Sequence, residues 1–300
     1  WLAVTPPASL SRLRIIHRAD LHRVLVDGLE SGTLRLGSTV MGVAASGRTI
    51  QVRGRTEHYD VVVAADGIRS AVRASWPSDP GIRYSGYCSW RGVTSTPVDL
   101  RGEAGETWGT RERFGMAPLR DGRVYWFAVA TMPRDAGFVD EFAEVRRRFS
   151  SWHDPIAELL DATDPADVFR LPIDDLSRPL RTFRRGRAVL LGDAAHAMTP
   201  NLGQGGNQAA EDAATLTALL APYAASIEPD SLAVDAALDR YDELRRRRTQ
   251  PIAARSRAIG ALAHAPAALV PVRNAILRLT PPSALARSLD ELQGWGVDVG

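Results

Sequence analysis

The stretch from Ala188 to Gln208 reads AVLLGDAAHAMTPNLGQGGNQ and decides the fold class of this chain. It opens with a short apolar run, Ala188–Leu191, which predicts a buried strand. The run ends in Gly192 and Asp193, and α/β proteins bind their ligands at the carboxyl ends of such strands. A carboxylate only accepts hydrogen bonds, so Asp193 at that edge suits a hydroxyl of a sugar or polyol.

The segment that follows, 192–206, is loop-like and rich in glycine. Pro200 stiffens it, and three glycines let the backbone approach a flat ligand: Gly203, Gly205 and Gly206. Asn207 leads into a predicted helix with Ala209, Ala213, Leu216 and Leu220 on one face. The free N–H groups at the start of that helix favour negative charge. The alternative is an ordinary Asp-Gly turn, and the glycine spacing is not a dinucleotide fingerprint.

A second strand-to-helix junction lies earlier in the chain. Residues 59–65 read YDVVVAA, an unbroken apolar run that predicts a central strand covered on both faces. The run ends in Asp66-Gly67, where Asp66 either caps the next helix or binds a ligand hydroxyl. Arg69 and Arg73 carry planar guanidinium groups that suit diphosphates or carboxylates, although each is also an ordinary surface residue.

The rest of the chain separates into helical and antiparallel patterns. Apolar spacing after Asp20 predicts a helix over 20–31 with Asp20 as its N-cap, and strands are expected at 34–36, 39–44 and 49–52. Between Ile82 and Met132, aromatic alternating stretches with an Asp121-Gly122 turn predict an antiparallel sheet. Helices are expected at 139–152 and 155–162, and in most of the C-terminal part. Prolines interrupt that part at Pro251, Pro266, Pro271 and Pro281-Pro282.

These patterns predict an α/β fold with an inserted antiparallel β domain and a helical C-terminus. We expect residues 1–78 and 183–300 to form the α/β layer and residues 79–182 to form the insertion.

Composition excludes several classes of chemistry. All 37 basic residues are arginine, which rules out a lysine Schiff base, a phosphate-loop lysine or a Ser–Lys pair. The formal net charge is only +2, and the basic run Arg245–Arg248 stands beside acidic residues, so we interpret it as a solvated helix face rather than a nucleic-acid surface. Cys88 is the only cysteine, so we expect a plain buried thiol, no internal disulfide and no zinc site.

Together the two junctions resemble the flavoprotein aromatic hydroxylases, the family of the para-hydroxybenzoate and salicylate hydroxylases. Asp66-Gly67 is similar to the family motif that binds both FAD and NAD(P)H, and Gly192-Asp193 to the second FAD motif, whose Asp contacts the ribityl chain. Arg18 stands where the family places an Arg near the flavin ribityl and phosphate. The resemblance implies FAD as cofactor, with Pro200, Gly203, Gly205, Gly206 and Asn207 along the isoalloxazine and the helix start stabilising its reduced, anionic form.

One departure from the family is serious. The family opens with a βαβ unit carrying Gly-x-Gly-x-x-Gly, which holds the FAD pyrophosphate on a helix N-terminus. Residues 1–16 do not supply it. We expect that the sequence begins inside a longer protein; a second chain, or weak FAD binding, is the alternative.

The resemblance also implies a reaction. NAD(P)H reduces FAD, O2 adds at the flavin C4a position, and the hydroperoxide hydroxylates an activated ring. The chemistry belongs to the cofactor, so no catalytic acid or base is assigned beyond the flavin-facing loop, and we interpret His196 as a structural histidine. The antiparallel insertion would form the substrate wall. Its candidate residues for a flat, anionic ring are Arg91, Arg111, Phe114 and Tyr125. The stretches 108–114 and 125–127 are similar to the urate, salicylate and 3-hydroxybenzoate hydroxylase branch of the family.

Two other functions stay open: a flavoenzyme of the same fold with different oxidative chemistry, such as epoxidation, and a non-catalytic fragment that does not retain FAD. The expected partners are a small aromatic substrate and O2, with no metal, nucleic acid or membrane, in a monomer or homodimer. No apolar run has the length of a membrane span, and the single cysteine favours a reducing cytoplasm.

Overall fold

The computed structural model describes residues 2–4, 15–224 and 231–296. The chain divides into two compact units. Unit 1 comprises residues 1–34, 84–173 and 261–293, and unit 2 comprises residues 35–83, 174–260 and 294–300. Unit 1 contains residues 84–173 of the predicted insertion, 79–182, together with an N-terminal and a C-terminal segment that were assigned to the α/β layer. Within the described ranges, no helix combines the length and the apolar character that crossing a bilayer requires.

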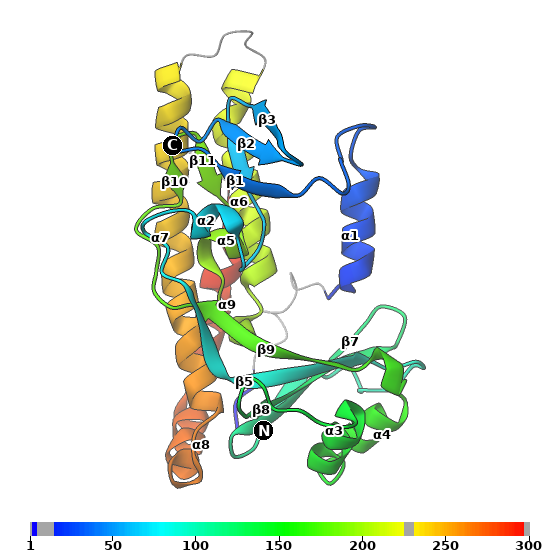
Figure 1. The fold of residues 1–300 in the computed structure, drawn as a ribbon. Coiled ribbons are helices and arrows are strands. Elements are labelled where there is room, and N and C mark those ends of the chain that lie inside the picture. The colour runs from blue at the N-terminus through cyan, green and yellow to red at the C-terminus, as the bar shows by residue number, and fades with distance from the viewer. Residues whose placement is uncertain (1, 5–14, 225–230, 297–300) are drawn as a thin grey trace. The chain divides into compact units, whose positions relative to one another are not determined.

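Unit 1 is built on a five-stranded sheet of order β6-β7-β8-β5-β9, and the predicted antiparallel pairing is confirmed for β6–β7, β7–β8 and β5–β8. Gly122 makes the expected turn between β7 and β8 with φ 83°. The elements, shown in Figure 1, are α1 (Arg18–Asp27), β5 (Ile82–Val93), β6 (Gly105–Trp108), β7 (Glu112–Pro118), β8 (Val124–Thr131), α3 (Glu141–Phe149), α4 (Ile156–Asp161), η2 (Pro165–Asp167), β9 (Phe169–Leu176), η4 (Ala267–Leu269), α8 (Val270–Leu279) and α9 (Pro282–Gln293).

One face of this sheet carries the hydrophobic core of unit 1. Trp90, Phe114 and Trp126 project from three strands that are neighbours in the sheet, β5, β7 and β8, and pack with apolar residues of α3 and α4. Cys88 belongs to the same core as a fully buried free thiol.

Unit 2 contains two three-stranded sheets, of order β1-β2-β3 and β10-β11-β4. In the second sheet β11 runs parallel to β4, with Ala188, Val189 and Leu190 opposite residues 62–64, which confirms the α/β character predicted from both junctions. The elements are β1 (Val40–Val43), β2 (Thr49–Val52), β3 (Arg55–His58), β4 (Val62–Ala64), α2 (Ala71–Ala74), β10 (Arg184–Arg185), β11 (Ala188–Leu190), α5 (Asp193–His196), η3 (Pro200–Leu202), α6 (Gly205–Ala224) and α7 (Ser231–Ala263), whose last residues belong to unit 1.

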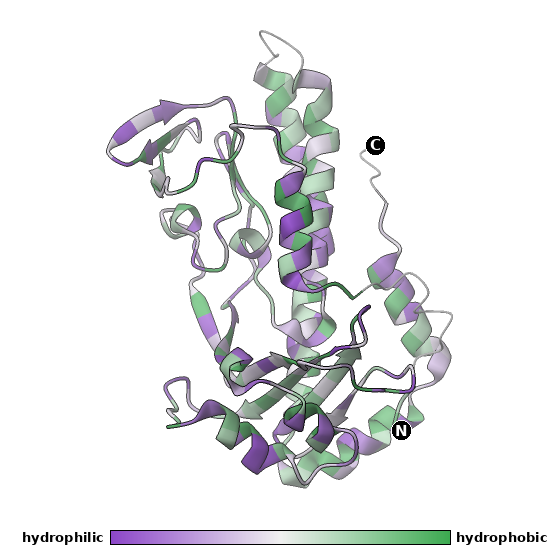
Figure 2. Cartoon of the chain, turned by 90° about the vertical axis from the view of Figure 1, so that its right-hand side faces the viewer, coloured by the Kyte–Doolittle hydropathy of each residue, from purple (hydrophilic) through white to green (hydrophobic). Residues whose placement is uncertain are grey.

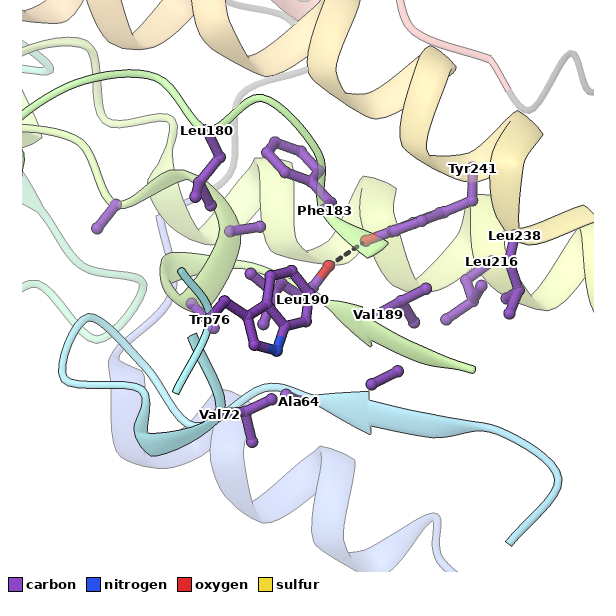
Figure 3. Close-up of a cluster of buried hydrophobic side chains, with 14 of the residues drawn as sticks. Ala64, Val72, Trp76, Leu180, Phe183, Val189, Leu190, Leu216, Leu238 and Tyr241 are labelled. Atoms are coloured by element: carbon purple, nitrogen blue, oxygen red, sulfur yellow. Dashed lines mark hydrogen bonds between the residues drawn. The ribbon is translucent and has the colours of Figure 1, made fainter. Parts of the chain in front are cut away.

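The core of unit 2 surrounds β11. Figure 3 shows Val189 and Leu190 between Trp76 on one side and α7 on the other. Tyr241 of α7 is buried and donates its hydroxyl to the carbonyl oxygen of Leu190 at 3.0 Å. This contact fixes the end of β11, and therefore the position of the glycine and aspartate that follow it.

Several local predictions were wrong. Helix α1 starts at Arg18, and Asp20 pairs with Arg23 instead of capping it. Residues 34–36 form no strand, and β4 is short and occupies an edge of its described sheet, with Val63 44% exposed. Pro251 does not interrupt α7, because a long helix can lose one backbone hydrogen bond and retain its packing.

Candidate functional site

The site begins at the carboxyl end of β11, where the chain turns at Gly192. This residue has φ 61° and ψ −137°, a conformation open essentially to glycine alone. A Cβ at this position would also lie 3.1 Å from the Cβ of Ala209 on α6. The turn therefore needs glycine for two independent reasons, and it places Asp193 at the start of α5.

Asp193 presents its carboxylate to solvent. The side chain is exposed, and no side-chain or backbone donor among the described residues binds it. Its Oδ1 lies 3.8 Å from the point where a Cβ of Gly205 would be, beside the first turn of α6. An acceptor-only group without an internal partner is available to a ligand hydroxyl.

The loop between α5 and α6 is fixed to α7 by hydrogen bonds at Ser256. The Ser256 hydroxyl donates to the carbonyl of Thr199 at 2.6 Å and lies 3.0 Å from the Thr199 hydroxyl. The amide of Asn201 donates to the same hydroxyl of Thr199 and to the carbonyl of Ser256. These bonds hold Pro200 at an exposed position at the start of η3.

The glycines after Pro200 leave open space along the loop. Gly203 adopts a left-handed conformation, with φ 62° and ψ 23°, and ends η3. A Cβ on Gly203 or Gly206 would meet nothing within 4 Å. Gly206 and Asn207 are exposed in the first turn of α6, where backbone N–H groups lack helical partners. The loop is thus shaped for close approach by a ligand carrying negative charge.

A buried polar network lies directly behind the turn. Asp212 of α6 is fully buried and accepts from the N–H of Gly192 at 2.8 Å, from His196 Nε2 at 2.6 Å and from Arg245 Nε at 2.5 Å. Arg245 of α7 also pairs with Glu211 at 3.0 Å and donates to Gln208. In Figure 2 the two long adjacent helices show bands of both purple and green, as expected for helices that bury polar groups among apolar ones.

This network corrects two predictions. Arg245 is buried and Arg248 pairs with Glu211, so the basic run is not wholly a solvated face; of the four, Arg247 is the clearly exposed residue. The apolar spacing predicted that Leu216 and three further apolar residues form one face of α6. The buried residues of α6 are instead mainly polar, and Leu216 is the one predicted residue among them: Gln208, Glu211, Asp212, Thr215 and Leu216. His196 is buried, contacts Phe183 and hydrogen-bonds Asp212, an arrangement that fits a structural histidine.

At the junction that follows β4, Asp66 hydrogen-bonds the start of helix α2, whose N-cap residue is Ser70. The Asp66 Oδ2 accepts the N–H of Ala71 at 2.9 Å at the start of α2, and the side chain is exposed. Arg73 is buried and donates to the carbonyls of Ile68 and Ala194 and to Asp79, so it ties α2 to α5 and is not free for a diphosphate. Arg69 is exposed, 4.0 Å from Asp174.

Arg18 is exposed at the start of α1 in unit 1, and its place near the flavin phosphate stays a prediction.

The substrate candidates divide between the two faces of the sheet in unit 1. Arg91 pairs with Phe127, and Tyr125 lies two residues before Phe127, so Arg91 and Tyr125 share one face. Burial raises the pKa of Tyr125, which stays a neutral phenol. Arg111 is exposed with φ 59° just before β7.

Phe114 lies on the opposite face, packed on Trp126 and Phe149 in the core. It pairs with Ala128, and successive residues of a strand point to opposite faces, so Phe114 and Phe127 lie on different sides of the sheet. A substrate role for Phe114 has no support from this placement.

Sequence reasoning missed His264, which lies just beyond α7. Its ring stacks on Tyr87 with centroids 4.2 Å apart, and its Nδ1 lies 3.2 Å from the Thr131 hydroxyl. Burial, with a contribution from the charge of Arg113, lowers the pKa of His264 to about 4, so the ring is neutral at pH 7. A lone histidine in a helical tail gives no sequence signal of such an environment.

The residues in unit 2 fit part of an FAD molecule. Asp193 has an unused acceptor, Gly203 and Gly206 border open space, and α6 offers its N–H groups at the same place. The sequence contains no Gly-x-Gly-x-x-Gly unit, which would hold the FAD pyrophosphate.

Comparisons with known proteins agree with this site. A family model described as an FAD binding domain matches residues 19–256. The chain is 43% identical over 250 residues to the aurachin C monooxygenase/isomerase of Stigmatella aurantiaca, covering 82% of this chain and 63% of that protein. It is 34% identical over 217 residues to an FAD-dependent urate hydroxylase of Klebsiella pneumoniae, covering 68% and 55%. The chain thus spans less than two thirds of the length of these relatives.

Solved structures give the same result. Klebsiella pneumoniae HpxO, complexed with FAD and uric acid, matches with a TM-score of 0.80 at 28% identity over 93% of this chain and 72% of that one. A salicylate hydroxylase substrate complex matches with a TM-score of 0.67 at 26% identity, over 91% and 75%. The predicted fold class and cofactor are confirmed, and this chain belongs to the FAD-binding-domain family, among the FAD-dependent monooxygenases.

Proposed function

We propose that this chain takes part in an NAD(P)H- and O2-dependent hydroxylation of an aromatic or heteroaromatic small molecule, with FAD as cofactor. The observation that carries the proposal is the exposed carboxylate of Asp193. It has no partner among the described residues, it follows a turn that only glycine can make, and it lies beside the N-terminus of α6.

The residues of the chain act by binding and orientation. Asp193 would accept a hydrogen bond from a hydroxyl of the ribityl chain, and the N–H groups at the start of α6 would stabilise negative charge on the bound flavin. Gly203 and Gly206 permit the backbone to lie close to a flat ring. When bound, FAD supplies the redox chemistry and the activation of O2, and the protein supplies position and electrostatics.

On the substrate side, the sheet face of unit 1 that carries Arg91 and Tyr125 supports an aromatic ligand. The neutral phenol of Tyr125 donates or accepts one hydrogen bond, and the guanidinium of Arg91 suits an oxo or anionic oxygen on the ring. The similarity to FAD-dependent urate hydroxylases supports a heteroaromatic substrate, because urate is a fused nitrogen heterocycle.

A second candidate is epoxidation. The chain is 34% identical over 266 residues to the chloroplastic zeaxanthin epoxidase of Arabidopsis thaliana, covering 84% of this chain and 39% of that protein. Transfer of one labelled oxygen atom from O2 to an aromatic carbon supports hydroxylation, whereas an epoxide product supports the alternative.

The test is an FAD titration of the 300-residue chain, followed by flavin absorbance and fluorescence. We expect saturable binding that Asp193→Ala weakens by tenfold or more, because it removes a charged acceptor worth about 1.5–3 kcal/mol. The matched control is Asp239→Ala, which alters an exposed aspartate of α7 paired with Arg184 at 2.7 Å. Equal binding by both variants would remove Asp193 from the cofactor site, and failure of a folded wild-type chain to bind FAD at all would contradict the proposal for this chain.

A further inference from the structure

An exposed surface of unit 1 is almost entirely apolar. It runs along η4 and α8, from Pro266 to Leu279, where ten residues are exposed and nine of them are apolar. The large ones are Leu269, Val272, Ile276 and Leu279, which are 54%, 56%, 49% and 80% exposed. Their spacing of three, four and three residues places them on one side of the helix, and we call them the α8 stripe.

Helix α8 is firmly attached to its own unit by its other side. Arg273 is buried and donates to the carbonyls of Trp108 and Gly109 at 3.1 and 2.7 Å, with its guanidinium over the Trp108 ring. Arg273 thus holds the helix in a fixed orientation, and the α8 stripe is a defined outer face rather than the side of a loose segment. Figure 1 shows α8 in orange, directly after the end of α7.

Helix α8 and the segment before it carry charges of one sign. Residues 244–289 contain no aspartate or glutamate, so no acidic side chain belongs to α8 or to the segment before it. Arg278 is the single exposed charged residue among the ten, and the following helix α9 exposes Arg287 first and then Asp290 and Glu291 toward its end. A short helix with an apolar outer face, arginine as its exposed charge and no acid of its own has the composition of a helix that lies on an anionic bilayer surface.

Other occupants fit this face less well. A stable protein interface needs roughly 800 Å² from each partner, and a helix of about three turns offers a few hundred. A second copy would bring two arginine-bearing, acid-free faces together with no carboxylate to pair them. Full insertion is not available to α8, which has ten residues against the roughly 20 that a span requires.

We propose that the α8 stripe is a peripheral membrane-docking surface, on which α8 lies in the plane of an anionic lipid interface. The proposal differs from our sequence-based expectation of no membrane partner, which rested on the lack of a spanning segment. The proposal does not depend on the flavin chemistry, because every residue that carries it lies in η4, α8 and their flanks.

The test is flotation of the 300-residue chain with vesicles of phosphatidylcholine, with and without phosphatidylglycerol, while light scattering measures the mass of the free protein. The wild type is expected to bind the anionic vesicles and to be released by salt. Replacing both Ile276 and Leu279 by Gln should lower the partition coefficient at least about tenfold, since two apolar side chains no longer enter the lipid. Arg278→Gln should lower it about fivefold on anionic vesicles only.

The matched control is Val139→Gln, which changes an even more exposed apolar residue beside Asp140 and Glu141 and should bind like the wild type. Thermal unfolding of each variant should match the wild type, because all the changed side chains are exposed. Absence of wild-type binding to anionic vesicles overturns the proposal. So does a dimer that the Ile276/Leu279 double variant converts to a monomer without any vesicle binding, which would assign the stripe to a second copy.

Discussion

Removing the carboxylate of Asp212 should destabilise unit 2 far more than removing an exposed carboxylate of the same unit. Asp212 is fully buried and accepts three hydrogen bonds, from Gly192, His196 and Arg245. In Asp212→Ala the N–H of Gly192 and the ring of His196 lose their acceptor inside the protein. The change therefore acts on the turn that places Asp193 as well as on the packing of α6 against α7.

The structure sets the size of the effect. Breaking a buried ion pair by removing one partner costs about 3–5 kcal/mol, because the other charge stays buried without compensation. Arg245 keeps Glu211 at 3.0 Å, so its charge is not left unpaired, and the lower end of the range applies. We expect the free energy of unfolding to fall by about 3 kcal/mol for Asp212→Ala and by less for Asp212→Asn, which retains one acceptor oxygen.

Urea unfolding followed by tryptophan fluorescence measures this difference. The control is Asp239→Ala, whose side chain is 73% exposed and whose ion pair with Arg184 should contribute at most about 1 kcal/mol. FAD titration of Asp212→Asn then tests whether the network also orients the turn, since binding should weaken although Asp193 is intact. If Asp212→Ala and Asp239→Ala unfold at the same urea concentration, the network is not a major source of stability and the reasoning fails.

Three further predictions concern single positions. Gly192→Ala should lower the unfolding free energy by about 2–3 kcal/mol, because the backbone conformation of Gly192 and its contact with Ala209 both oppose a Cβ. Gly203→Ala should lower it by only about 1–2 kcal/mol, because a Cβ there would meet open space. Thermal unfolding of the two variants measures which is less stable. Because the folded pKa of His264 is about 4 and the unfolded pKa about 6.5, the neutral ring favours the folded state. Stability is therefore complete above pH 6.5 and falls by up to about 3 kcal/mol as the pH drops to 4; His264→Phe should flatten that part of the curve, and an unchanged slope would contradict the assignment. Arg73→Ala should cost about 3 kcal/mol and Arg69→Ala less than 1 kcal/mol by urea unfolding, and equal values would show that the buried contacts of Arg73 contribute little.

The sequence predicted the strand-to-helix junctions well because their signals are local. An apolar run, a glycine and an aspartate follow one another directly, and the structure has β11, the Gly192 turn and, after the loop, α6 in that order. The short helices α5 and η3 inside the predicted loop were not predicted. The antiparallel sheet was predictable for the same reason, from alternation and the turn at Gly122.

The polar interior of unit 2 could not be predicted by pattern. Asp212 and Arg245 are charged residues in helices, and sequence patterns assign such residues to solvent unless the partner is known. The two lie on different helices and meet only through tertiary packing. Phe114 shows the complementary error: an aromatic in a strand signals burial, but the face on which it is buried depends on register.

The parallel pairing of β4 with β11 has a consequence for the order in which this protein is made. Residues 62–64 leave the ribosome long before residues 188–190, and most of the strands and helices of unit 1 are synthesised in between. At about 5–20 residues per second, the earlier strand waits roughly ten seconds for its partner. During that time its backbone donors and acceptors lack their native pairing with β11. The nascent chain should therefore need a chaperone most while the intervening segment is being translated, and slowing translation there should increase aggregation.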